Sequence, residues 1–125
     1  MSADEQPIFV FGSNLAGRHG KGAALWARNH RGAIYGQGVG LQGRSYAIPT
    51  KGVRLEILPI AKIHDYVRDF INFAARNPAE TFQLTPIGCG LGGYKHSEIA
   101  PLFADAPPNV ILPDEFRKIL RTHHN

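Results

Sequence analysis

The 125-residue chain has one cysteine and no long apolar run, and each lack excludes a class of protein. Cys89 alone cannot form an internal disulfide or a cysteine-based zinc site, which is typical of a reducing compartment. No apolar stretch approaches the roughly 20 residues that span a bilayer, and the acidic start, residues 1–5, is unlike a basic signal peptide. We therefore expect a cytoplasmic protein with no membrane partner.

Carboxylates are missing from one long segment. Residues 6–55 contain no aspartate or glutamate, although the whole chain has 10 acidic and 14 basic residues. This acid-free segment holds seven basic residues: Arg18, Lys21, Arg28, Arg31, Arg44, Lys51 and Arg54. A segment with seven basic and no acidic side chains creates a positive field that attracts anions, of which phosphate is the most common. The alternative interpretation is a basic face that is simply solvated. The segment cannot supply a magnesium-binding carboxylate or a carboxylate pair, and we expect no metal site and no cofactor.

Glycine is plentiful and gathers in two blocks. Of the 14 glycines, all but Gly52 lie in residues 12–43, the first glycine block, or in residues 88–93, the second. Glycine permits positive φ and lets a ligand approach main-chain N–H groups closely. We therefore expect two loops built for such contact.

Short apolar runs alternate with segments of helical periodicity, which is typical of an α/β protein. The expected strands are residues 8–11, 45–48, 81–85 and 109–112. The expected helices are residues 21–30, 60–74, 97–104 and 114–121. Pro49 is expected to stop the second strand, while Ser97 and Asp114 are expected to cap the last two helices. This order predicts one domain, residues 1–125, with three α/β/α layers around a mostly parallel mixed sheet.

Both glycine blocks begin where a strand is expected to end. Ligands of α/β sheets bind at the carboxyl ends of strands, and helix N-termini bind phosphate through free amides. Lys21 beside a helix N-terminus opposes the helix dipole, which indicates that an anion sits there. The P-loop motif fails because Gly22 follows Lys21, and the G-x-G-x-x-G pattern at residues 88–93 lacks the acidic partner of a dinucleotide site.

Four segments, taken in their order and spacing, resemble a macro domain: residues 13–15, 20–24, 43–51 and 86–94. The Ile-Pro-Thr-Lys and Ile-Gly-Cys-Gly-Leu sequences at 48–51 and 87–91 are most similar to the branch with terminal ADP-ribose glycohydrolases and DarG antitoxin macro domains. The resemblance covers roughly residues 8–103. It implies a macro-domain-like fold and a small-molecule partner, ADP-ribose or a related nucleotide, free or attached to an ADP-ribosylated macromolecule.

The resemblance also implies roles for individual residues. Asn14 is expected to hydrogen-bond the distal ribose, the amides of residues 20–23 to line the ribose and phosphate path, and residues 88–93 to wrap the pyrophosphate. The expected ligand-binding residues are Gly12, Ser13, Asn14, Arg18, Gly20, Lys21, Gly22, Ala23, Ile87, Gly88, Cys89, Gly90, Leu91, Gly92, Gly93 and Tyr94. The acidic residue with which the family recognises adenine has no counterpart here, and Gly92 stands where many members place an aromatic ring.

Hydrolysis of an ADP-ribose derivative, as a phosphatase or an ADP-ribosyl hydrolase, is the second hypothesis. The glycohydrolase branch implies a lysine in the first helix and an aspartate after Gly-x-Gly-Leu, but this chain has Gly92 in the aspartate position. Lys21 and His19 remain as candidate catalytic residues, with His19 as general acid or base. Cys89 is a weaker candidate nucleophile, and packing is the favoured interpretation of its side chain.

A nucleic-acid-binding domain is the third hypothesis, suggested by the formal net charge of +4. It ranks last because the sequence has no known reader motif and no interleaved pattern of aromatic and basic residues. Binding of a nucleotide-derived ligand ranks first, since the glycine loops and the acid-free segment both favour it and the expected catalytic pair is missing.

Overall fold

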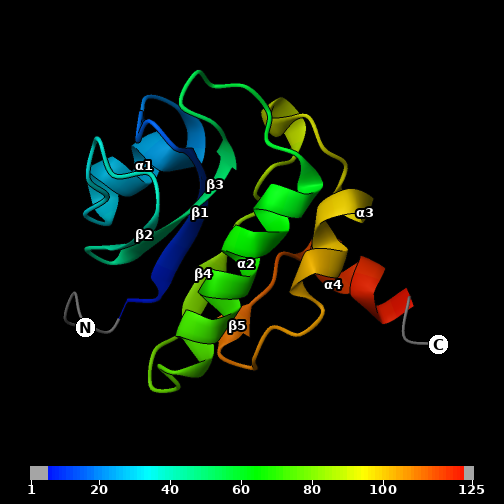
Figure 1. Ribbon diagram of the computed structural model, residues 1–125. Helices are drawn as coiled ribbons and strands as arrows, with labels where there is room; N and C mark the ends of the chain where they lie inside the picture. The colour runs from blue at the N-terminus through cyan, green and yellow to red at the C-terminus, as the bar shows by residue number, and fades with distance from the viewer. Residues whose placement is uncertain (1–5, 123–125) are drawn as a thin grey trace.

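The computed structural model describes residues 6–122, which are built around a five-stranded mixed sheet (Figure 1). Along the sheet the strands lie in the order β2-β3-β1-β4-β5. Their bounds are β1 Ile8–Asn14, β2 Gly40–Gln42, β3 Ser45–Lys51, β4 Phe82–Leu84 and β5 Val110–Ile111. β3, β1, β4 and β5 run parallel, and β2 is antiparallel to β3. The predicted α/β class with a mostly parallel mixed sheet is therefore confirmed.

Four helices flank the sheet in the described part of the chain. They are α1 Gly22–His30, α2 Ile60–Ala75, α3 His96–Ile99 and α4 Asp114–Thr122, and the short 3₁₀ segments η2 Gly90–Gly92 and η3 Ala100–Phe103 accompany them. The buried residues of α2 follow the predicted three-or-four spacing: Ile63, Val67, Phe70, Ile71 and Ala74. Among residues 6–122 no helix has the length and apolar character that crossing a membrane requires.

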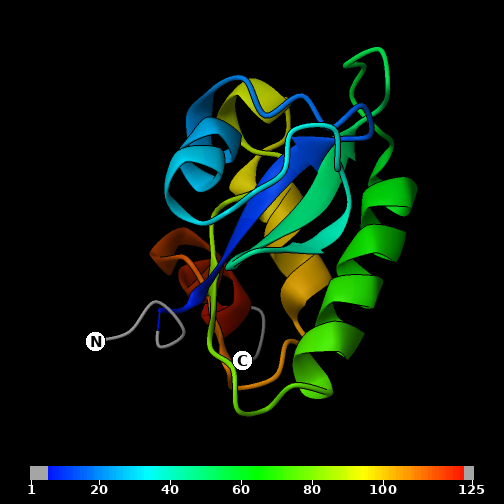
Figure 2. The same cartoon turned by 90° about the vertical axis from the view of Figure 1, so that its left-hand side faces the viewer.

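The central strand β1 is buried on both faces, because successive side chains of a strand point to opposite sides. Ile8 and Val10 belong to the larger core, which α2 and η3 help to form. Phe9 and Phe11 belong to a smaller core with Ala24 and Ala27 of α1 and other small residues. Figure 2 shows α1 and α2 on opposite sides of the sheet. The apolar run that predicted this strand thus supplies both cores.

Three local expectations were wrong, one of them at Asp114, which is the first residue inside α4 and does not cap it. Pro49 does not stop β3, which continues to Lys51. The missing N–H of proline is tolerated because β2 pairs only with residues 45–47 and the β1–β3 register shifts just beyond the Ser13–Pro49 pair. Ser97 does not cap α3, which begins at His96 and is capped when the Lys95 amide donates to Glu98 Oε1 at 2.9 Å.

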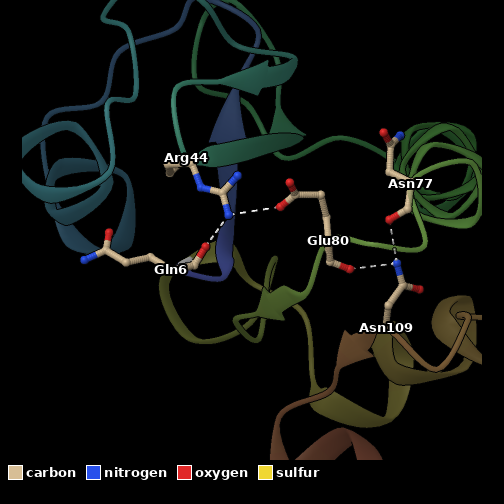
Figure 3. A network of polar contacts seen from close by, with 5 residues as sticks. All are labelled: Gln6, Arg44, Asn77, Glu80 and Asn109. Carbon is tan, nitrogen blue, oxygen red and sulfur yellow. Dashed lines mark hydrogen bonds and ion pairs between the residues drawn. The ribbon is translucent and has the colours of Figure 1, made fainter. Parts of the chain in front are cut away.

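A polar network links the four segments that immediately precede the parallel strands β1, β3, β4 and β5 (Figure 3). The Arg44 guanidinium donates to the Gln6 carbonyl and lies 3.0 Å from the Glu80 carboxylate. Asn109 Nδ2 lies 3.0 to 3.1 Å from three backbone carbonyls, those of Ala74, Asn77 and Glu80. These residues hold the amino ends of β1, β3, β4 and β5 together. Because the four strands run parallel, their carboxyl ends lie together at the opposite end of the sheet.

Replacing Asn109 with alanine tests this network. Asn109→Ala is expected to lower the free energy of unfolding by about 1–3 kcal/mol, because three carbonyls lose their shared donor. Urea denaturation measures the change, and Asn29→Ala on the exposed face of α1 is the control, with an expected change below about 0.5 kcal/mol. Equal effects of the two substitutions would contradict the proposed role of Asn109.

Candidate functional site

A pocket of about 680 Å³ lies at the carboxyl ends of β1, β3 and β4. Its wall is made by residues 12–14 at the end of β1, by Arg18 and residues 20–24 around the start of α1, by residues 50–51 at the end of β3, and by residues 85–89 and 91–92 after β4, with Tyr35 and Leu55 added from two further loops. A volume of this size accommodates a small-molecule ligand. The sheet topology therefore places the candidate site where ligands of parallel sheets bind.

Most of the expected ligand-binding residues meet in this pocket. Those that line it are Gly12, Ser13, Asn14, Arg18, Gly20, Lys21, Gly22, Ala23, Ile87, Gly88, Cys89, Leu91 and Gly92. Gly90, Gly93 and Tyr94 are not part of the lining. The Tyr94 hydroxyl instead donates to the Leu58 carbonyl at 2.6 Å, and its ring packs against the larger core. Residues of both glycine blocks thus line one pocket.

The charged side chains of the lining are all cationic. Arg18, Lys21 and Lys51 line the pocket, and no aspartate or glutamate does. All three come from the acid-free segment, and none forms an ion pair within residues 6–122. Like charges gathered without counter-charges create a positive potential that attracts an anion.

Asn14 organises the loop that carries Arg18. Its Nδ2 donates to the Arg18 carbonyl at 3.1 Å, and its Oδ1 accepts from the Arg18 amide at 2.9 Å. The Ser13 hydroxyl is engaged as well, since it donates to the Gly38 carbonyl. The Asn14 amide retains one N–H and acceptor capacity for a ligand. Its structural role in the loop was not evident from the sequence.

His19, a candidate catalytic residue of the sequence, does not line the pocket. The side chain is fully buried, edge-on to Phe11, and its Nε2 lies 2.9 Å from the Gln37 carbonyl and 3.2 Å from Gln42 Oε1. Gln42 Oε1 also accepts from the Ile34 amide at 2.8 Å. Both neighbours of Nε2 are acceptors, so Nε2 carries the proton and donates. The imidazole therefore holds two loops together, and Lys21 is the remaining catalytic candidate at the pocket.

Four glycines of the two glycine blocks fall into two kinds. A Cβ on Gly17 would lie 2.2 Å from the Gly36 carbonyl carbon, and one on Gly38 would lie 2.2 Å from the Asn14 carbonyl oxygen. Close backbone packing therefore requires glycine at both. At Gly20 and Gly92 a Cβ would meet no heavy atom within 4 Å, and neither residue has positive φ. The folded chain does not require glycine at these two pocket positions, which leaves the space free for a ligand.

Cys89 lines the pocket but is poorly suited to act as a nucleophile. Burial raises the pKa of its thiol to about 11, and the carboxylates of Glu115 and Glu98 add to the increase. The Sγ atom lies 3.4 Å from the Ile87 carbonyl, to which the thiol donates. The thiolate is the reactive form of cysteine, so this thiol is unreactive near neutral pH.

Sequence reasoning missed several residues of the lining, among them Tyr35, Thr50, Lys51, Leu55 and Thr85. The Ile-Pro-Thr-Lys sequence at 48–51 was a usable signal for Thr50 and Lys51. No motif marks Tyr35, whose loop is held by the distant bond from the Gly36 amide to the Gly17 carbonyl, or Leu55, which lies in a turn that the sequence does not signal. Within residues 6–122 no group of three or more His, Cys, Asp or Glu side chains is arranged to hold a metal ion.

Comparison of the chain with models of known protein families, with curated proteins and with solved structures found no match. The function of the pocket therefore has to follow from its own residues. Its defining features are three unpaired cations, two glycine-rich loops and the N-terminus of α1.

Alanine substitution distinguishes the two kinds of glycine. Gly38→Ala is expected to lower the free energy of unfolding by more than about 2 kcal/mol, because the added methyl overlaps backbone atoms. Gly20→Ala and Gly92→Ala are expected to change it by less than about 1 kcal/mol, since the methyl enters open space. Urea denaturation measures all three variants. A loss at Gly20 or Gly92 equal to that at Gly38 would show that these residues serve the fold.

Alkylation tests the state of Cys89. Iodoacetamide is expected to modify it at least about tenfold more slowly than free cysteine near pH ~8, because the thiolate is scarce and the thiol is half-buried. The rate, followed by mass spectrometry, should keep rising until the pH approaches the pKa of about 11. The same chain in urea is the control and should react like free cysteine. A plateau below about pH 9 in the folded protein would contradict the raised pKa.

Proposed function

We propose that the chain binds ADP-ribose or a related nucleotide-derived anion, with its phosphates held between the two glycine-rich loops. The observation that carries this proposal is the composition of the pocket lining, in which Arg18, Lys21 and Lys51 stand without any carboxylate. Unpaired cations that share a small-molecule pocket repel one another until an anion neutralises them. A ligand whose phosphates carry two or more negative charges can neutralise these cations.

Backbone amides supply the second part of the phosphate site. Gly22 and Ala23 open α1 and line the pocket, and Lys21 at the N-cap makes no side-chain capping bond. The first turn of α1 contains no acidic residue. The amides at the start of a helix have no partner within the helix and are available to phosphate oxygens. Lys21 adds a full positive charge beside these amides.

The resemblance to macro domains supports ADP-ribose in particular. Helices on both faces of a mostly parallel sheet are consistent with a three-layer macro-domain-like arrangement, in which both phosphate loops lie at strand ends. The branch with terminal ADP-ribose glycohydrolases and DarG antitoxin macro domains is the most similar in its motifs. We propose that the ligand is taken either free or as the modification of an ADP-ribosylated macromolecule.

Binding is favoured over the hydrolase and nucleic-acid hypotheses. Lys21 lines the pocket, but His19 is buried elsewhere and the Cys89 thiol is protonated near neutral pH. The described lining contains no carboxylate and no imidazole, and imidazole is the group that most often moves a proton in general acid–base hydrolysis. The lining cations lie inside a pocket sized for a small molecule, which favours a nucleotide ligand over a long nucleic acid.

Calorimetric titration with ADP-ribose, ADP-ribose phosphate, NAD and cyclic dinucleotides tests the proposal. At least one of these ligands is expected to bind, and Lys21→Gln and Lys51→Gln should each lower its affinity about tenfold, as expected for a lost charged contact. Lys62→Gln, which changes an exposed lysine of α2 outside the pocket, is the matched control.

Gly92→Glu should abolish binding by placing a carboxylate in the pocket, whereas Ser97→Glu, outside the lining, should not.

Two results would contradict the proposed function. The first is the absence of binding by every ligand of the panel. The second is an equal loss of affinity in Lys62→Gln and Lys21→Gln, which would mean that the pocket cations have no special part. Turnover of ADP-ribose phosphate that is lost in Lys21→Ala would establish the hydrolase hypothesis in place of simple binding.

A further inference from the structure

A large aromatic side chain stands exposed at the cation-lined pocket. Tyr35 lines the pocket and is 55% exposed, whereas most aromatic rings of this chain are buried. The Arg28 guanidinium lies 5.0 Å from the centroid of its ring. This cation–π contact covers one face of the ring and favours the observed position of the side chain. Tyr35 is therefore an ordered aromatic surface next to the phosphate site.

The loop that carries Tyr35 is held from both sides. The Ile34 amide donates to Gln42 Oε1 at 2.8 Å, and the Gly36 amide donates to the Gly17 carbonyl at 2.8 Å. Gln42 is almost fully buried and also contacts His19. An exposed ring on a fixed loop loses little conformational entropy when a ligand covers it.

A second exposed apolar side chain lines the same pocket. Leu55 is 42% exposed and has φ of 63°, in the left-handed region that a leucine rarely adopts. The turn is fixed by bonds between the Leu55 amide and the Gly52 carbonyl at 3.0 Å and between the Gly52 amide and the Glu56 carbonyl at 2.9 Å. Strain of this kind is found at binding sites, where the surrounding structure maintains it.

We propose that Tyr35 stacks on the planar base of the bound nucleotide, with Leu55 as a further apolar contact. The inference rests on the proposed function and names the part of the ligand that the cations leave unrecognised. The cations and amides already supply donors for phosphate, and phosphate has no use for the flat face of the Tyr35 ring. A planar base gains from stacking on an aromatic ring whatever its hydrogen-bonding pattern. The two features together therefore select a nucleoside phosphate over a sugar phosphate or a free phosphate.

Titrations of Tyr35 variants with ligands that differ in their rings test this assignment. Tyr35→Ala is expected to weaken ADP-ribose binding roughly tenfold, as the loss of one stacked base predicts, while Tyr35→Phe stays within about twofold of the wild type. Ribose 5-phosphate and pyrophosphate carry no base, so their affinities should be equal in wild type and Tyr35→Ala. Tyr35→Leu keeps apolar bulk without an aromatic face and should also weaken ADP-ribose, which guards against a folding defect of the alanine variant.

Each other outcome overturns a defined part of the account. Wild-type protein that binds ADP-ribose with an affinity unchanged in both Tyr35→Ala and Tyr35→Leu overturns the stacking inference and leaves the proposed function standing. An equal loss for ribose 5-phosphate shows that Tyr35 contacts the sugar and overturns base stacking. Wild-type protein that binds none of the ligands overturns the proposed function and the inference with it.

Discussion

The burial of β1 on both faces, between two parallel neighbours, is the constraint on which the rest of the structure depends. Successive side chains of β1 belong alternately to the two cores. Its backbone pairs with β3 on one side and with β4 on the other. Because these strands run parallel, the segments that follow them all leave the sheet at its same end, where the carboxyl ends of the strands lie. Lys21, Lys51 and the loop around Cys89 meet there although they are far apart in sequence.

Cations of the acid-free segment have different surroundings at the two ends of the sheet. Arg44, before β3, lies against the carboxylate of Glu80. Arg18, Lys21 and Lys51, beyond the opposite ends of the strands, have no carboxylate partner within residues 6–122. Arg44 is thus neutralised at the amino ends of the strands, whereas the three cations that line the pocket are not. An anion from outside the chain can neutralise these three pocket cations.

Local patterns in the sequence predicted the parts of the structure that depend on local interactions. The apolar run of β1 and the helical spacing of α2 predicted their elements because burial imposes those periods. The burial of His19 could not be predicted, since it depends on Gln37 and Gln42, which lie 18 and 23 residues away in a stretch without periodicity. The continuation of β3 through Pro49 could not be predicted for a similar reason, because it depends on where the antiparallel neighbour β2 begins, at the Gly40–Ala47 pair. Tyr35 reaches the pocket through a distant contact as well, because the Gly36 amide donates to the Gly17 carbonyl.

The central claim is that both glycine-rich loops bind the phosphates of one ligand. The most direct measurement is the mapping of backbone amide resonances by ¹⁵N NMR during titration with ADP-ribose. The account predicts that the amides of residues 20–23 and of residues 88–92 shift together, at the same ligand concentration, while the amides around Asn109 stay unchanged. Shifts confined to one loop, or gathered at another surface, would contradict it.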